Sequence, residues 1–417
     1  MKRKIIVHYS PKRKEYVMSK KMNWVLTDVK AGIWLDALCV TPENSSCNGV
    51  CGWSIVKRTL HGGLTDGVDV IEVNNGALSF TIVPSRGMGL WKGHYNGFEI
   101  GWRSPVAGPV NPLFVNYADH GGLGWLQGFD ECIVRCGLSS NGAPGKDSVP
   151  DNNGNSAEIM LPLHGRIANS PASRVTVDVI ESNGVTELVV SGIVDEGMLF
   201  FPCLRLETRF STVVGSNAVT IHDEIVNMNT MTQELELLYH CNFGEPFLEK
   251  GGRLVAPSRK VAPRDPRAME GLKGYDTYMA PTPGYVEQVY WHRLCADRKG
   301  NTVTMLRNKA GNKGVALRFN LKQLPCFTQW KNTAGAGDGY VTGLEPGTNL
   351  PNPKRFERQQ GRVIRLAPGE RHVVDLTMEI HTTRQSVAAV EREVSTLRGG
   401  KTAQVCPAPI PEWSPGA

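Results

Sequence analysis

Glu345 is the residue of this chain whose surroundings best suit proton transfer. A β-type run at residues 340–342 leads into Gly343-Leu344-Glu345, and Pro346-Gly347 then breaks the strand, because proline removes a backbone donor and glycine tolerates positive φ. The sequence therefore predicts a carboxylate at a strand end, held rigidly beneath an ordered loop. Such a carboxylate suits a general base, although an ordinary carboxylate on the rim of a sheet would have the same pattern.

Three histidines lie in stretches rich in glycine, asparagine and arginine that interrupt the β pattern. Glycine follows His120 and His164 and lets a ligand or a second backbone approach closely, whereas His240 directly follows the apolar run 235–239. Imidazole changes its charge near neutral pH, so each histidine could exchange protons with a substrate. A single histidine of this kind is more often structural, but three of them together with Glu345 favour an acid–base site.

Short β-type segments joined by turns fill most of the chain and must position these residues. Asn-Gly turns separate β-branched runs within residues 68–83 and 174–194, which is the strongest local signal for a hairpin. Further hairpins are predicted within 302–319 and 363–380, and a helical spacing of apolar residues appears only after residue 383. The pattern predicts an all-β fold, a large sandwich of antiparallel sheets with one short C-terminal helix.

The excess positive charge is confined to the N-terminus. The formal net charge is +6, yet residues 1–21 hold eight Lys or Arg against one acid, so the remainder of the chain is nearly neutral. We therefore expect a solvated basic arm over residues 1–21 that folding and activity do not need, one β-sandwich over 22–385, and a short helix with a mobile Pro-rich tail over 386–417. Because no basic surface covers the folded part, a nucleic-acid partner is not expected.

Composition and spacing also bear on membranes, metals and cofactors. The chain has no long uncharged apolar stretch and its basic N-terminus lacks the apolar core of a signal peptide, so a cytoplasmic protein without a membrane partner is predicted, of unspecified oligomeric state. Its ten cysteines form no CxxC pair and have no histidine at ligand spacing, so we expect reduced thiols and no metal. The Gly-rich stretch 335–339 precedes a strand rather than a helix, so no nucleotide or other cofactor is predicted.

Five motifs follow one another along the chain. They are VPSRGMG at 83–89, HGGLGWLQGFDE at 120–131, LHGRIAN at 163–169, YHCNFGEP at 239–246 and GLEPGTNLPN at 343–352. In this order they resemble the aldose 1-epimerases (galactose mutarotase-like superfamily), and most closely its DUF4432-type group. The resemblance implies a galactose mutarotase-like β-supersandwich, in agreement with the predicted hairpins. It also implies that Glu345 is the base, that His240 is the acid, and that His164 helps to bind the sugar.

The chemistry of such an enzyme indicates which further residues to consider. A mutarotase takes the proton of the anomeric hydroxyl while it protonates the ring oxygen, so that the ring opens and recloses on its other face. This needs one acid and one base, expected on opposite sides of the ring, and neither metal nor nucleotide. A sugar also needs a flat apolar surface and several hydrogen-bonding groups. The candidate substrate-binding residues are His164, His120, Arg86, Arg166, Asn242, Asp130, Lys331 and Trp330, with Trp291 as a further stacking candidate.

The sequence favours an aldose 1-epimerase-like isomerase whose partner is a monosaccharide or sugar derivative. The alternatives are a related isomerase or lyase of keto or acid sugars, which would use the same acid and base, and a non-catalytic carbohydrate-binding protein. The fold itself does not separate these functions. A binding protein has no need for an acid near a base, so the joint presence of Glu345 and His240 favours an enzyme.

Overall fold

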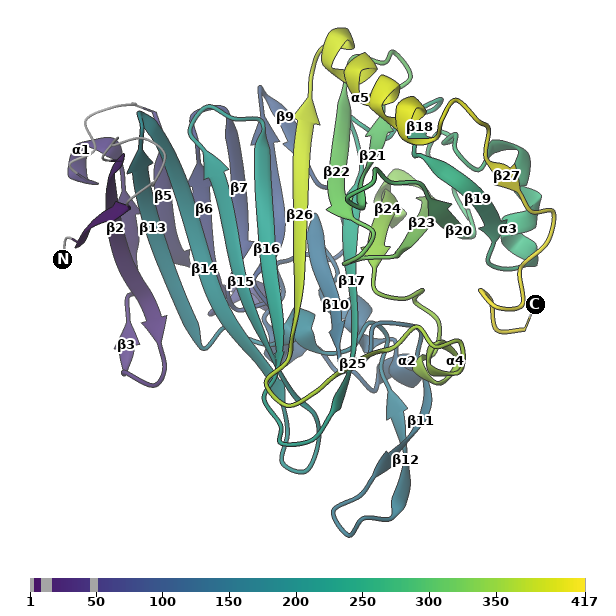
Figure 1. The fold of residues 1–417 in the computed structure, drawn as a ribbon, viewed down its shortest axis with the longest axis horizontal. Coiled ribbons are helices and arrows are strands. Elements are labelled where there is room, and N and C mark those ends of the chain that lie inside the picture. The colour runs from purple at the N-terminus through teal and green to yellow at the C-terminus, as the bar shows by residue number, and fades with distance from the viewer. Residues whose placement is uncertain (1–3, 9–16, 46–51, 417) are drawn as a thin grey trace.

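The computed structural model describes residues 4–8, 17–45 and 52–416, and two large sheets make up most of this part of the chain (Figure 1). Within it, the first sheet has eleven strands: β1 (Lys4–His8), β2 (Val17–Asp28), β13 (Arg174–Ser182), β14 (Val185–Gly197), β15 (Cys203–Val213), β16 (Ala218–Asn227), β26 (Arg371–His381), β22 (Gly314–Asn320), β21 (Asn301–Arg307) and β18 (Arg253–Val255) in this order, with β3 (Ile33–Trp34) paired to β2.

The second sheet has fourteen strands in the same described residues. Their order is β27 (Gln404–Val405), β19 (Ser258–Pro263), β20 (Gln288–Leu294), β23 (Cys326–Thr333), β24 (Tyr340–Gly347), β17 (Gln233–Phe243), β10 (Ile133–Leu138), β8 (Gly89–Tyr95), β7 (Leu78–Val83), β6 (Asp69–Asn74), β5 (Ser54–Thr59) and β4 (Leu38–Val40), with β25 (Ile364–Leu366) on β17 and β9 (Phe98–Ile100) on β8. Neighbouring strands are antiparallel except β27 and β19. The all-β prediction is therefore confirmed.

The remaining elements are short. A two-stranded hairpin, β11 (Gly145–Pro150) and β12 (Ser156–Leu161), projects from the body of the molecule (Figure 1). The α-helices are α1 (Pro42–Ser45), α2 (Asp119–Gly122), α3 (Pro266–Glu270), α4 (Lys354–Gln359) and α5 (Arg384–Leu397), and the 3₁₀ turns are Gly63–Thr65, Pro112–Phe114, Gly124–Gly128, Ile167–Asn169, Leu272–Gly274 and Ala336–Asp338. None of the helices in the described ranges is both long and apolar enough to cross a membrane.

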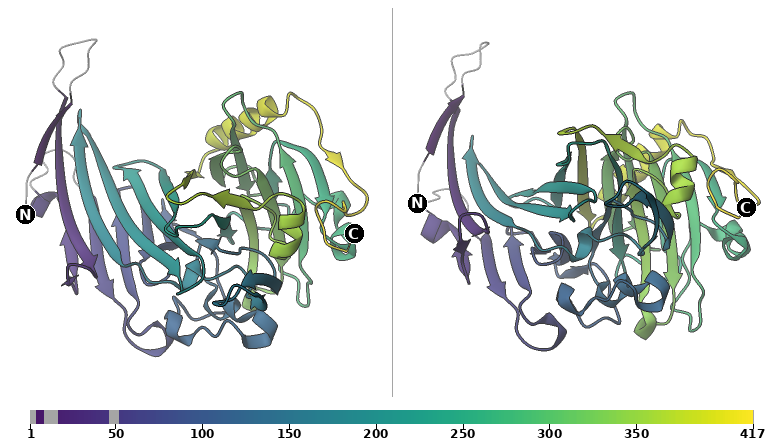
Figure 2. Two further views of the ribbon diagram at one scale, coloured as in Figure 1. Left: turned by 60° about the horizontal axis from the view of Figure 1, so that its bottom comes forward. Right: turned by 90° about the horizontal axis from the view of Figure 1, so that it is seen from below.

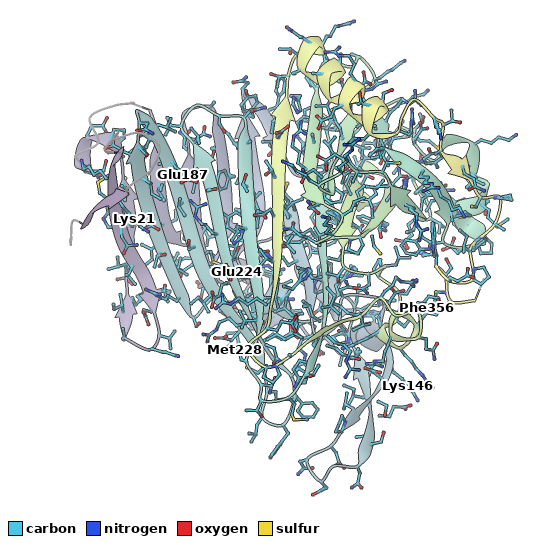
Figure 3. The ribbon with its side chains drawn as sticks, viewed as in Figure 1. Lys21, Lys146, Glu187, Glu224, Met228 and Phe356 are labelled. Carbon is cyan, nitrogen blue, oxygen red and sulfur yellow. The ribbon has the colours of Figure 1, made fainter. Side chains whose placement is uncertain are left out.

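The two sheets face each other across one apolar core (Figure 2). Along β15 every second residue from Leu204 to Thr212 is buried, while the residues between are partly exposed, which is the period of a strand with one face on a core. Charged residues occupy the outer face, where Arg209 forms an ion pair with Glu187 at 2.8 Å. Glu187 and Glu224 both lie on this face of the first sheet (Figure 3).

The second sheet, by contrast, is covered on both faces where β10, β17 and β24 lie. All residues of β10 and β24 are buried. Along β17, Leu237 and Tyr239 belong to the core between the sheets, whereas Leu238 packs against Trp125 on the outer side. The two-residue period of a strand therefore places His240 on the outer side as well, beneath the loops that cover it.

One ion pair joins the two sheets inside the core. Arg135 of β10 donates hydrogen bonds to both carboxylate oxygens of Asp223 on β16, with Nη2 to Oδ1 at 2.9 Å, and Tyr239 donates its hydroxyl to the same carboxylate. Arg135 also donates to the hydroxyl of Thr208 at 2.7 Å. Arg135 and Asp223 are both fully buried, so their charges are balanced by each other rather than by water.

The sandwich begins before residue 22, the boundary predicted from the sequence. β2 starts at Val17 and pairs with β13 from Ser19 to Asp28, and Lys21 forms an ion pair with Asp178 at 3.0 Å. β1 in turn pairs with β2. The run of basic residues suggested a solvated arm. Lysine is also common on edge strands, so charge alone does not distinguish an arm from an edge strand. Residues 1–3 and 9–16 of the predicted arm lie outside the described residues.

The C-terminal helix forms as predicted, but the tail beyond it is anchored rather than mobile. Thr383 caps α5 by accepting a hydrogen bond from the backbone of Ser386. Further on, β27 pairs with β19, the indole of Trp291 donates to the hydroxyl of Ser414 at 2.8 Å, and Trp413 packs in an apolar cluster with Trp291. The prolines therefore mark a strap along the second sheet and not a disordered end.

Deleting residues 404–417 is expected to lower the melting temperature by roughly 5 °C or more, because the deletion removes β27 and uncovers Trp291 and Leu350. Thermal unfolding followed by circular dichroism measures the change. Trp413→Ala should reproduce part of the loss, whereas Met231→Ala, which alters an exposed side chain, should leave the melting temperature unchanged. A full-length melting temperature in the deletion variant would mean that the strap does not contribute to stability.

Candidate active site

A cavity of about 300 Å³ opens on the outer side of the second sheet, above the adjacent strands β20, β23, β24 and β17. His240, Glu345 and Trp330 form part of its floor. Its walls are loops, and two of them continue into the projecting hairpin: Pro144 directly precedes β11, and His164 follows shortly after β12. A volume of this size is at the lower end of the range of small-molecule sites and is open enough for a single sugar ring.

Glu345 lies near the end of β24, as the sequence predicts, with neighbouring strands hydrogen-bonded on both sides. β23 pairs Thr328 with Glu345, and β17 pairs Cys241 with Leu344. The carboxylate is buried, and its Oε1 lies 3.3 Å from Nε2 of His240. Burial raises the pKa of Glu345 well above its ordinary value. The nearby charge of Glu287 raises this pKa further, and Arg264 partly offsets both effects.

His240 is held in one tautomer by Asn242, two residues further along β17. The Asn242 amide nitrogen donates to the backbone carbonyl of Glu131 at 2.9 Å, which leaves its Oδ1 to accept a hydrogen bond from Nδ1 of His240 at 2.6 Å. Nδ1 therefore carries the hydrogen, and Nε2 directs a lone pair at Glu345. Asn242, predicted to bind substrate, instead positions the imidazole.

The contact between His240 and Glu345 requires a proton, because a lone pair and an ionised carboxylate oxygen would otherwise face each other. Burial lowers the pKa of His240 well below its ordinary value, and the neighbouring His164 lowers it further. The raised pKa of Glu345 and the lowered pKa of His240 both favour a proton on the carboxyl group and a neutral imidazole. The two groups are thus a buried pair placed to pass one proton between them.

His164 faces His240 across the cavity, with ring centroids 5.4 Å apart. Its Nδ1 donates to the backbone carbonyl of Asn141 at 2.8 Å, so Nε2 is free to accept a hydrogen bond. Burial lowers the pKa of His164 to about 4, which keeps the ring neutral at physiological pH. The following residue, Gly165, must be glycine, because a Cβ atom there would lie 2.1 Å from the carbonyl oxygen of Ser140.

Aromatic side chains surround the imidazole of His240 and line the cavity. The ring centroids of Phe129 and Trp330 lie 5.0 and 5.3 Å from that of His240, and Trp125 packs against His164 at 4.6 Å. These rings supply the flat apolar surface that a sugar requires, and they account for the low polarity that shifts both pKa values. Trp330 was predicted from the sequence, whereas Trp125 and Phe129 were quoted in a motif without a role.

Arg264 and Glu287 also line the cavity, and neither was predicted from the sequence. Arg264 donates to Glu287 at 2.8 Å and to Asp265 at 2.8 Å, and Glu287 accepts a second hydrogen bond from the indole of Trp330 at 2.6 Å. Arg264 is the only permanent cation among the described residues that line this cavity, and two carboxylates balance its charge. Neither residue belongs to a motif, so no local signal could have indicated them.

Several predicted substrate-binding residues have other partners. Arg86 is fully buried and donates to the side chains of Glu131 and Asn169 and to two backbone carbonyls, so it organises the loops instead of reaching a ligand. Lys331 points to the opposite side of β23 from Trp330, where its ammonium group donates to the carbonyls of Gly274 and Thr277. Both corrections follow from strand alternation and burial, which a residue type alone does not reveal.

The other corrections concern residues at the surface or in a different cavity. The side chain of His120 is 81% exposed and contacts Asp119, outside the cavity. Arg166 is exposed and stacks over Tyr117. Asp130 is buried but lines a second cavity, separate from the one that holds Glu345. Trp291 packs against the C-terminal strap and does not line the cavity either.

The described residues contain no cluster of three or more His, Cys, Asp or Glu side chains that could hold a metal ion. At the candidate site this reflects the geometry, since the buried Glu345 faces one imidazole and aromatic rings. Its Oε1 atom accepts no hydrogen bond from the described groups and lies 3.3 Å from Nε2 of His240. This arrangement can accept one proton and deliver another within a short distance.

Comparisons with known proteins agree with the fold. Residues 65–380 match the family described as "Domain of unknown function (DUF4432)". A solved structure from Klebsiella pneumoniae subsp. pneumoniae MGH 78578, described as a "putative aldose 1-epimerase", is 36% identical with a TM-score of 0.87, over 94% of this chain and 99% of that chain. A galactose mutarotase-like protein from Clostridium acetobutylicum shares the fold at 15% identity and a TM-score of 0.54, over 79% of this chain and 98% of that one. A sequence search of curated proteins finds no match.

Proposed function

Because this chain belongs to the DUF4432 family and has a galactose mutarotase-like fold, we propose that it is a carbohydrate isomerase that interconverts sugar anomers or epimers by opening the ring. The observation that carries the proposal is the contact between Glu345 and His240 at the floor of a cavity lined by aromatic rings. Fold alone would not support an activity, since one fold hosts many functions. A buried carboxyl group in contact with a buried imidazole, by contrast, is suited to concerted acid–base chemistry.

The reaction needs one proton delivered and one removed at neighbouring atoms. The member of the pair that holds the proton gives it to the ring oxygen, and the bond from that oxygen to the anomeric carbon breaks with its electron pair moving to oxygen. The other member takes the proton of the anomeric hydroxyl as the carbonyl forms. The pair then again holds one proton, rotation turns the carbonyl, and the reverse steps close the ring on its other face.

This geometry differs from the sequence-based expectation of an acid and a base on opposite sides of the ring. With Nε2 and Oε1 only 3.3 Å apart, no ring fits between them. The ring oxygen and the anomeric oxygen, however, are bonded to the same carbon, so a sugar that presents this carbon edge-on can reach both groups at once. The directions of the two pKa shifts also favour Glu345 as the initial proton donor and His240 as the acceptor, the reverse of the family-based assignment.

Charges at the cavity favour a neutral sugar. Arg264 is balanced by Glu287 and Asp265, so a phosphate or carboxylate on the substrate would find no unpaired cation among the described lining residues. His164 offers a hydrogen-bond acceptor at Nε2, and Trp330 and Phe129 offer apolar surface. The site therefore supports a neutral sugar more strongly than the acid sugars considered from the sequence.

Polarimetry with freshly dissolved aldoses tests the proposed function. The protein should accelerate the approach to the anomeric equilibrium of at least one neutral monosaccharide, and EDTA should leave the rate unchanged. The rate should be constant around neutral pH and fall at both ends. At low pH a proton on His240 removes the base, and at high pH loss of the Glu345 proton removes the acid. The lowered pKa of His240 moves the first loss of rate to lower pH, and the raised pKa of Glu345 moves the second to higher pH, so the plateau between them is wide. Sugar binding without any acceleration would favour a non-catalytic binding protein.

A further inference from the structure

A second cavity of about 310 Å³ lies beside the first and has no role in the chemistry described above. Asp130, Trp91 and Trp102 line it, from β8 and from the loops that precede β10. Two aromatic rings separate the cavities. Trp102 lines the second cavity and Phe129 lines the first, and their ring centroids lie 5.0 Å apart.

Asp130 gives the second cavity a buried polar group that lacks one partner. Its Oδ2 accepts a hydrogen bond from the indole of Trp91 at 2.8 Å, whereas its Oδ1 has no hydrogen-bond partner among the described residues. The residue is only 6% exposed, so bulk water does not readily compensate for the missing bond. A hydroxyl group of a ligand in this cavity would supply it.

The rest of the lining fits a hydroxylated ring better than an ion. Trp102 is partly exposed and Tyr340 adds a further aromatic ring. The rim carries Lys92 and Arg103 against Glu99 and Glu245, so the charges on the rim cancel and neither sign of ligand is favoured. Aromatic faces combined with donors and acceptors of both kinds are the groups that recognise neutral polyols.

A hydrogen-bond path also connects the two cavities. The indole of Trp102 donates to the backbone carbonyl of Glu131 at 3.1 Å, and the amide of Asn242 donates to the same carbonyl at 2.9 Å. Asn242 in turn fixes the tautomer of His240. A ligand on Trp102 would therefore lie two hydrogen bonds away from the group that orients the imidazole.

We propose that this second cavity is a separate binding site for a neutral polyhydroxylated ligand such as a sugar ring, with Asp130 as its hydrogen-bonding group and Trp102 as its stacking surface. The proposal does not depend on the proposed isomerase activity, because the two cavities have different lining residues and a binding measurement tests it.

The test is ¹⁹F NMR of protein labelled with 5-fluorotryptophan, titrated with D-glucose, D-galactose, D-ribose and maltose. Trp91 lines only the second cavity and Trp125 only the first, so their resonances, assigned with Trp91→Phe and Trp125→Phe, report the two sites separately. At least one of these sugars should shift the Trp91 resonance saturably. Asp130→Leu keeps the branched shape of the side chain but removes both oxygens, and it should weaken that titration about tenfold, which is the expected loss for one hydrogen bond of a buried polar group.

A crossed control separates the second site from the first. His164→Asn should weaken the Trp125 titration and leave that of Trp91 unchanged, while Asp130→Leu should do the opposite. The proposal is overturned if none of the four sugars shifts Trp91 at concentrations up to about 100 mM, the limit of very weak binding. It is also overturned if the Trp91 shift follows the Trp125 titration and weakens with it in His164→Asn, since the ligand would then occupy only the first cavity. Neither outcome depends on turnover, so loss of this proposal and loss of the proposed function are distinguishable.

Discussion

Replacing Glu345 with glutamine is expected to lower kcat about 10²–10⁴-fold while leaving sugar binding nearly unchanged. Glutamine has the same shape and fits the same buried position on β24, but its amide cannot hold or release the proton that Glu345 shares with His240. His240→Asn removes the other half of the pair and should cause a loss of similar size. Polarimetric progress curves over a range of sugar concentrations give kcat and KM separately.

Two matched histidine variants show whether the loss is specific. His164→Asn should mainly raise KM, because His164 faces the cavity as a neutral hydrogen-bond acceptor without contacting Glu345. His120→Asn should change neither constant, since that side chain is exposed and outside the cavity. If Glu345→Gln retained more than about a tenth of the wild-type kcat, the pair would not be the site of proton transfer.

Asp223→Ala is expected to destabilise the protein by about 3–5 kcal/mol, the typical cost of breaking a buried ion pair by removing one partner. The substitution leaves the guanidinium of Arg135 uncompensated in the core and removes the acceptor of the Tyr239 hydroxyl. Because Asp223 and Arg135 come from different sheets, the loss falls on the contact that holds the sandwich together. Urea denaturation followed by intrinsic fluorescence measures the free energy of unfolding.

An exposed pair on the same sheet serves as the control. Asp195 and Arg205 form an ion pair at 2.7 Å on the outer face, with side chains that are 34% and 22% exposed. Asp195→Ala should cost no more than about 1 kcal/mol, since water and salt screen such pairs. Equal losses for the two variants would show that burial does not set the strength of the inter-sheet pair.

The sequence singled out two of the residues that line the candidate site. Glu345 and His240 could be selected because a strand-end carboxylate and a histidine after an apolar strand lie in recognisable motifs. The contact between Glu345 and His240 could not be predicted, because it depends on the pairing of β24 with β17. That pairing brings together residues about a hundred positions apart. Strand pairing across such distances leaves no local trace in a single sequence.

The misassigned residues share a physical cause. Arg86 and Lys331 were taken for ligand-binding groups because of their hydrogen-bonding capacity, yet burial directs that capacity to the protein's own carbonyls and carboxylates. Arg264 and Glu287, which do line the cavity, flank the strands β19 and β20 in ordinary polar surroundings of the sequence. Composition likewise suggested a mobile C-terminal tail, because the residues that anchor it, such as Trp291, lie far away in the chain.

The position of β24 between two hydrogen-bonded neighbours also has a consequence for motion. The strands β17, β23 and β24 lie in the middle of a sheet, where their backbone amides are hydrogen-bonded to neighbouring strands. We therefore expect the amide hydrogens of the cavity floor, which carries Glu345, to exchange with solvent only when a large part of the structure unfolds. Pro144 and His164, in contrast, border the hairpin of β11 and β12, which lies outside both large sheets. The ion pair of Arg358 on α4 with Asp147 on β11 anchors this hairpin. Lys146 of this hairpin and Phe356 of α4 mark the two elements in Figure 3. Opening of the hairpin costs less than opening of the floor, so the wall of the cavity can adapt to a ligand while the proton-sharing pair stays in place.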